Sequence, residues 1–118
     1  MSQENPKSLK LPSKVYIGYR DYDVNEMLEE EKGTHIGFHH GQYQYITINT
    51  DGKPNEVVNT LLHEILHGVL DMAGFCFEGE DDEECIVNSL GNGLTQVLRD
   101  NPDVINWMLT TLNAKQLQ

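Results

Sequence analysis

The segment from Pro54 to Gly74 constrains the fold most, because it combines a helical apolar period with two histidines one turn apart. Asp51-Gly52 is typical of a turn, Pro54 suits a first helical position, and Gly74 suits a C-terminal stop. Apolar residues between these signals recur at spacings of three and four: they are Val57, Val58, Leu61, Leu62, Ile65, Leu66, Val69 and Leu70. We therefore expect a helix of about twenty residues here, buried along one face.

The two histidines belong to the sequence His63-Glu64-Ile65-Leu66-His67, past the midpoint of this helix. Residues four apart lie on the same helix face, so both imidazoles can bind one metal ion, with Glu64 beside it. In the H-E-x-x-H pattern two histidines bind zinc, and the carboxylate accepts a proton from a coordinated water. The alternative is two solvated histidines on an amphipathic helix. Because both histidines lie beside the apolar stripe, we expect a metal site at the edge of the core, open to a cleft.

A site with two histidines is incomplete, since catalytic zinc has three protein ligands and structural zinc usually has four. A carboxylate in the first turn of a helix packed against the H-E-x-x-H helix could supply the third. In the helix expected over 82–99, Glu83 lies near the middle of the apolar stripe and Glu84 lies toward its edge. The pattern therefore leaves both residues open as the third ligand. Both could instead merely favour a helix N-terminus electrostatically. Other candidates are the hairpin histidines and, as soft ligands, the cysteines: His35, His39, His40, Cys76 and Cys85.

Length and charge limit the remaining choices. A chain of 118 residues is expected to form one domain, residues 13–118, preceded by a flexible arm, residues 1–12. Acidic residues outnumber basic ones by 19 to 8, giving a net charge of −11. Such a surface repels nucleic acid and anionic membranes, so the expected partner is a protein or peptide. No apolar run has the length of a membrane span and the start lacks a signal-peptide core, which predicts a cytoplasmic location.

The order of predicted elements indicates an α+β fold. We expect a strand over 14–20, a short helix over 23–33, a β-hairpin formed by 34–39 and 43–49, and helices over 82–99 and from Pro102 onward. The predicted architecture is a short antiparallel sheet with a β-hairpin packed on the H-E-x-x-H helix, followed by two C-terminal helices.

A family resemblance adds to these predictions. The H-E-x-x-H helix is followed at short range by Glu84-Cys85-Ile86-Val87-Asn88-Ser89-Leu90-Gly91. This combination resembles the ImmA/IrrE type of small zinc metallopeptidase and, more broadly, the minimal gluzincins. Leu98-Arg99-Asp100-Asn101-Pro102 is similar to a segment of compact phage- and prophage-encoded zincin-like proteins. The resemblance covers residues 44–102, although after Gly91 the sequence departs from the family's usual continuation.

The resemblance implies a zincin-like domain with Zn²⁺ as cofactor, and it implies Glu84 as third ligand beside His63 and His67. With Glu64 as general base, the expected function is hydrolysis of peptide bonds by a zinc-dependent endopeptidase. The alternative is a non-catalytic or latent zinc-binding domain that acts through protein–protein interaction. Intact Glu64 favours the enzyme, because a structural site has no use for a general base. A more remote alternative is an acidic inhibitor in which the histidines are incidental.

Supporting residues are predicted less specifically. A further donor to the reacting carbonyl oxygen could come from His39, His40, Tyr43 or Tyr45. Metal-binding imidazoles need a hydrogen-bond acceptor behind them, for which Asn88 and Asp71 are candidates. The hairpin before the helix could offer a strand edge to a substrate peptide.

Overall fold

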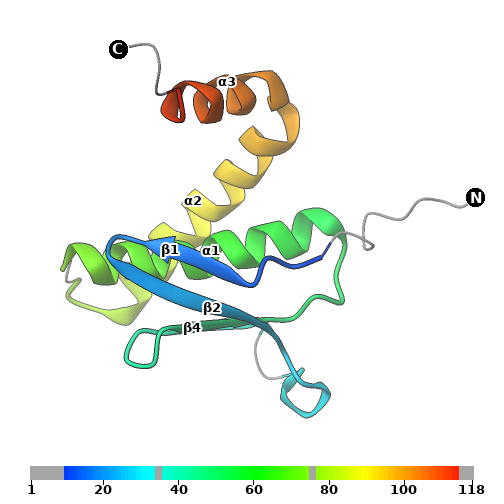
Figure 1. Cartoon of the computed structure of the whole chain (residues 1–118). Helices are drawn as coiled ribbons and strands as arrows, with labels where there is room; N and C mark the ends of the chain where they lie inside the picture. The colour runs from blue at the N-terminus through cyan, green and yellow to red at the C-terminus, as the bar shows by residue number, and fades with distance from the viewer. Residues whose placement is uncertain (1–9, 34–35, 75–76, 115–118) are drawn as a thin grey trace, which may run out of the picture.

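The computed structural model describes residues 10–33, 36–74 and 77–114, which form a small α+β protein (Figure 1). A four-stranded mixed sheet is followed by three helices. The strands are β1 (Lys14–Ile17), β2 (Arg20–Glu26), β3 (Gly37–His40) and β4 (Tyr45–Ile48), with a 3-10 turn η2 (Glu29–Glu31) between β2 and β3. The helices are α1 (Pro54–Ala73), α2 (Glu80–Asp100) and α3 (Pro102–Leu112).

The strands are ordered β1-β2-β4-β3. The expected hairpin is confirmed, because β3 pairs antiparallel with β4, His40 opposite Tyr45. The prediction of a purely antiparallel sheet is wrong, since β2 and β4 are parallel, with Val24 opposite Ile46. The sheet is mixed because β4, rather than the preceding β3, pairs with β2. This order leaves β3 at one edge.

The predicted helix over 23–33 is also wrong, because its first residues belong to β2. Tyr22 and Val24 are buried and alternate with exposed residues, which is the period of a strand. The backbone N–H and C=O groups of β2 form hydrogen bonds with β1 on one side and with β4 on the other. In a helix the same groups would have bonded within the segment itself. The spacing of Val24, Met27 and Leu28 imitates a helix face, but Met27 is buried and Leu28 is exposed.

The hydrophobic core lies between α1 and one face of the sheet (Figure 1). The predicted limits of α1 are confirmed: it begins at Pro54 and is followed by Gly74 in the left-handed region, with a φ of 71°. The sheet contributes four buried side chains and α1 packs several partly buried ones onto them: Ile17, Tyr22, Ile46 and Ile48, covered by Val57, Leu61, Ile65 and Met72.

One row of α1 is buried more deeply than its apolar stripe. Thr60, Glu64 and Gly68 are spaced four apart and are the buried residues of the helix. The backbone of β3 approaches this row closely, because a Cβ at Gly37 would lie 2.9 Å from Thr60 Cγ2 and 3.3 Å from Glu64 Oε2. The absence of a side chain at Gly37 therefore lets the edge strand lie directly against Glu64.

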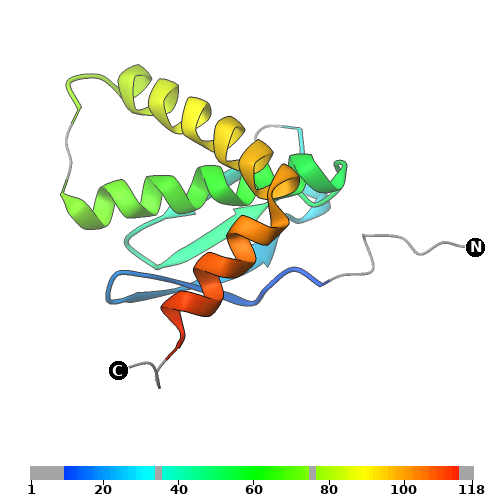
Figure 2. The same ribbon diagram turned by 90° about the horizontal axis from the view of Figure 1, so that it is seen from above.

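Helix α2 packs on the other flank of α1 (Figure 2). Val87, Gly91 and Thr95 form its buried row. The two helices approach closely at Gly91, since a Cβ there would lie 2.9 Å from Asn59 Oδ1 and 3.9 Å from the Cα of His63. This contact holds the N-terminal part of α2 beside the two histidines. No helix in the described part of the chain is long and apolar enough to cross a membrane.

Candidate metal centre

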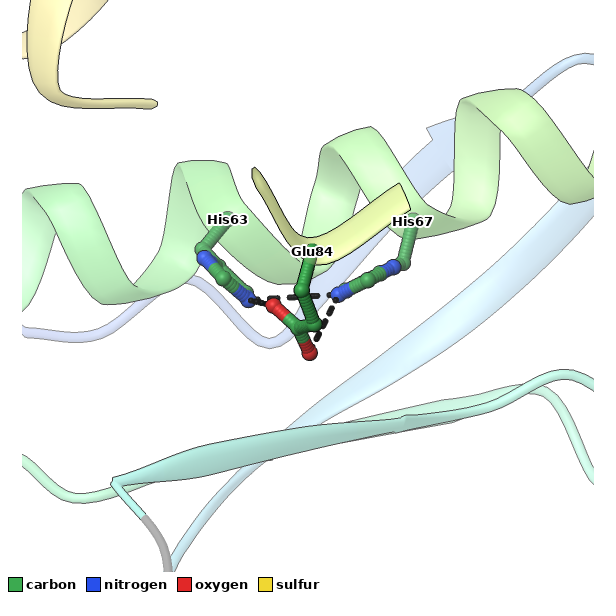
Figure 3. Close-up of side chains that lie close together, drawn as sticks. All are labelled: His63, His67 and Glu84. Carbon is green, nitrogen blue, oxygen red and sulfur yellow. Dashed lines mark hydrogen bonds and ion pairs between the residues drawn. The ribbon is translucent and has the colours of Figure 1, made fainter. Parts of the chain in front are cut away.

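His63 and His67 point from α1 toward the same place, and Glu84 reaches it from near the N-terminal end of α2 (Figure 3). The two Nε2 atoms are 3.2 Å apart. Glu84 places Oε1 3.0 Å from Nε2 of His63 and Oε2 3.4 Å from Nε2 of His67. Three potential ligand atoms, two imidazole nitrogens and one carboxylate oxygen, thus converge within 4.8 Å of one another.

These separations suit coordination of a single ion. In a tetrahedral site with bonds of about 2.0–2.1 Å, two ligand atoms lie roughly 3.3 Å apart. The observed separations between the three residues run from 3.0 to 3.4 Å. His63, His67 and Glu84 therefore form a group that could hold a metal ion.

Glu83 supports the same group from behind His67. Its Oε2 lies 2.6 Å from Nδ1 of His67, so Nδ1–H donates to the carboxylate. This hydrogen bond leaves the Nε2 lone pair of His67 directed toward Glu84, in the tautomer that binds a metal. Of the two neighbouring glutamates, Glu84 contributes the atoms near both Nε2 nitrogens and Glu83 contacts the outer nitrogen. From the sequence, Glu83 is either a rival ligand or an acidic residue that favours a helix N-terminus, and this hydrogen-bonding role is not predicted.

Of the two acceptors expected from the sequence, Asn88 contacts one of the two imidazoles and Asp71 does not. The Asn88 side chain lies near His63, where it favours the protonated imidazole. Asp71 instead forms an ion pair with Arg20, whose Nη1 lies 3.1 Å from Oδ2. The sequence pattern did not predict Arg20 as a neighbour of this site, because its ion pair with Asp71 joins β2 to the C-terminal end of α1, far along the chain.

Glu64 is the most buried acid of the site, with 5% of its surface exposed. Burial raises the pKa of Glu64 to about 7, His67 opposes this shift, and the negative charge of Glu84 adds to it. Burial also lowers the pKa of His63, against the effect of Glu84. A neutral imidazole is the form that binds a metal, so the environment of His63 favours a ligand.

A cleft of about 880 Å³ opens over these residues. The residues that line the cleft include four carboxyl groups and one permanently charged base, Arg20. The four acids are Glu64, Asp71, Glu83 and Glu84. Such an excess of negative charge favours a bound cation. The opposite wall is the edge strand and its flanks, which contribute Ile36, Gly37, Phe38, His39 and Gly41.

The other candidate ligands do not join the group within the described residues. His39 lines the cleft, but its Nε2 lies 3.0 Å from the hydroxyl of the buried Tyr22. His40 stacks on Tyr45, with ring centroids 4.6 Å apart. Cys85 is a free, exposed cysteine. His35 and Cys76 fall outside the described residues.

No protein family, curated protein or solved structure that we compared matches this chain. The resemblance to small zinc metallopeptidases therefore rests on the residues quoted for it. The chain is established as a small α+β protein with a possible His/His/Glu metal-binding group.

The raised pKa of Glu64 predicts an unusual pH dependence for the metal-free protein. The Glu64 carboxyl has an ordinary pKa of 4.5 and reaches about 7 in the fold. The folded state binds this proton more tightly than the unfolded state does. Protonated Glu64 therefore adds its full contribution to the free energy of unfolding below pH 4.5, and this contribution is lost as the pH rises through 7. The loss amounts to roughly 3 kcal/mol in the free energy of unfolding.

Urea unfolding with a chelator present, at about pH 5 and about pH 8, measures this effect. Glu64→Gln should resemble the wild type at the lower pH and exceed it in stability at the higher pH. Both proteins share His63, so its depressed pKa cancels in the difference. An equal dependence on pH in the two proteins would contradict burial of an ionisable Glu64.

Proposed function

We propose that this protein is a small zinc-dependent endopeptidase. In this proposal His63, His67 and Glu84 bind the zinc ion and Glu64 is the general base. The observation that carries the proposal is the position of Glu64: its carboxylate lines the same cleft as the three candidate ligands, directly against the edge strand. A site built only to stabilise the fold gains nothing from a buried, ionisable carboxyl at that position.

The donor set fits zinc. Two imidazole nitrogens and one carboxylate oxygen match the ligands of zinc peptidases, which keep a coordination position open for water. When bound, zinc supplies a Lewis acid that acidifies water and polarises a carbonyl group. Its positive charge would also favour ionised Glu64 at neutral pH, offsetting the effect of burial. Glu64 would then accept a proton from the attacking water and return it to the leaving amine.

The edge strand gives the substrate a place to bind. β3 pairs with β4 on one side only, and its residues form the wall of the cleft opposite the histidines. An extended peptide added beside β3 would form main-chain hydrogen bonds with it and pass over Glu64. The preferred substrate is therefore an extended, unfolded segment of a protein rather than a folded surface.

His39 is the best candidate for the additional donor to the reacting carbonyl. Of the four residues predicted from the sequence, His39 lines the cleft, whereas His40 and Tyr45 stack on each other beside it. Burial lowers the pKa of His39, and its Nε2 atom is hydrogen-bonded to the Tyr22 hydroxyl. A neutral imidazole fixed in this way can donate from its other nitrogen without reorganisation.

Metal analysis combined with protease profiling tests the proposal. The purified protein should contain close to one zinc per chain, and lysate proteins exposed to it should acquire new N-termini. These N-termini should be absent when a chelator is present. A protein that binds no zinc, and whose melting temperature is unchanged by zinc or by a chelator, would refute the proposal.

A further inference from the structure

The second helix and the third carry ten large apolar residues that are exposed, and we name this group the α2/α3 face. The exposed fractions of these residues lie between 36% and 81%. The α2/α3 face comprises Ile86, Leu90, Leu94, Val97, Leu98, Val104, Trp107, Met108, Leu109 and Leu112.

Within the described residues this face is not covered by the rest of the protein. α2 meets α1 through the row of Val87, Gly91 and Thr95, and the apolar stripe lies beside that row rather than on it. α3 packs on α2 and stands away from the sheet (Figure 1). All of α3 is exposed except Ile105, which is half-buried.

The size of this face is that of an interface. Summed over its members, the exposed surface of these apolar residues is on the order of 1,000 Å², whereas the largest apolar patch on a monomer is typically about 300–600 Å². A stable dimer buries about 800 Å² on each partner. α3 has 11 residues, too few for a helix to be stable in water without packing. Association would supply that packing.

The charge distribution indicates a second copy of this chain as the partner. Residues 85–98 contain no charged side chain, and residues 99–112 contain only Arg99, Asp100 and Asp103. Nearly all of the net charge of −11 therefore lies outside the face. A basic partner would be attracted to other surfaces, whereas two uncharged faces meet without like-charge repulsion.

The chain's own N-terminal residues do not suit this face. Residues 1–9 include only Met1 and Leu9 as large apolar side chains. Two such side chains are too few to cover an area of this size. A second α2/α3 face, in contrast, offers a surface of equal area and the same chemistry.

We propose that the protein forms a homodimer through the α2/α3 face, with each copy presenting the same surface to the other. None of the residues of the face lines the cleft, so both clefts stay open in the dimer. Glu83 and Glu84 lie near the N-terminal end of α2, and the residues of the face follow from Ile86 onward. Helix α2 carries the acidic residues of the metal centre near one end, and dimerisation would fix the other end of the same helix.

Light scattering coupled to size-exclusion chromatography tests the proposal on the full chain. The wild type should show twice the 13.4 kDa mass of one chain. Leu112→Glu, at a side chain that is 81% exposed, should raise the dissociation constant at least about tenfold, because the dimer would have to bury a charge. Tyr16→Glu is the matched control: its side chain is 69% exposed on β1, outside the face, and the variant should stay dimeric.

The fluorescence of Trp107 gives a second readout that needs no variant. Trp107 is the single tryptophan of the chain and belongs to the face. Its emission should shift to longer wavelength when the wild type is diluted through the dissociation range. A wild type that runs as a single chain, or as a complex with a different protein, would overturn the proposal. A dimer that Tyr16→Glu weakens as much as Leu112→Glu would also overturn it.

Discussion

Glu64→Gln is expected to abolish peptide hydrolysis while leaving the metal in place. Glutamine keeps the size of the side chain and leaves His63, His67 and Glu84 unchanged, so the ligand set is intact. It cannot accept a proton, and loss of a general base typically lowers the rate about 10²–10⁴-fold. Because glutamine also removes the buried ionisable group, the variant should be folded and at least as stable as the wild type.

The measurement compares three proteins on the same lysate: the wild type, Glu64→Gln and Glu30→Gln. Glu30 lies in the exposed η2 turn, outside the cleft, so its variant controls for loss of one acidic charge. New N-termini should appear with the wild type and Glu30→Gln only, and zinc content should be equal in all three. Metal retained with unchanged cleavage by Glu64→Gln would remove Glu64 from the mechanism.

The same experiment distinguishes the enzyme from the non-catalytic alternative. A domain that binds a protein partner without cleaving it would leave the three lysates identical. It would also retain the same co-purified partner with the wild type and with Glu64→Gln, since that substitution spares the surface. This outcome would favour a latent or purely binding role.

Glu84→Gln is expected to weaken metal binding far more than Glu83→Gln. The Glu84 carboxylate lies 3.0 Å and 3.4 Å from the two Nε2 nitrogens, so its loss removes a ligand. Glu83 contacts Nδ1 of His67, and loss of such an outer partner typically lowers metal affinity about 10–100-fold. The two variants form a matched pair, because both remove one negative charge from the same turn of α2.

Zinc titration with a competing chelator measures both affinities, and thermal unfolding gives an independent check. Metal that binds only the native state adds RT ln(1 + [L]/Kd) to the free energy of unfolding. The zinc-dependent rise in melting temperature should therefore be largest for the wild type, smaller for Glu83→Gln, and nearly absent for Glu84→Gln and His67→Ala. The reverse order for the two glutamates would assign Glu83 as the ligand.

Local sequence signals predicted the helices and the β3–β4 hairpin. The limits of α1 follow from Pro54 and Gly74, whose backbone preferences act within one or two residues. The signal failed at β2, where the spacing of Val24, Met27 and Leu28 suggested a helix. Tyr22 and Val24 are in a strand because neighbouring strands pair with both of its edges, and those strands come from other parts of the chain.

The candidate site divides in the same way. His63, Glu64 and His67 are one turn apart on a single helix, so their common face is a consequence of helical geometry alone. The sequence by itself therefore determined the two histidines, their adjacent carboxylate and the helix that carries them.

Only the tertiary structure decided which glutamate approaches the histidines and how deeply Glu64 is buried. Glu83 and Glu84 differ by one position, and the rotation of α2 about its axis is set by its packing at Gly91 against α1. The burial of Glu64 depends on Gly37 of an edge strand that lies outside the helix. Such contacts join residues distant in the chain, and their geometry depends on how whole elements pack, which no local period or motif specifies.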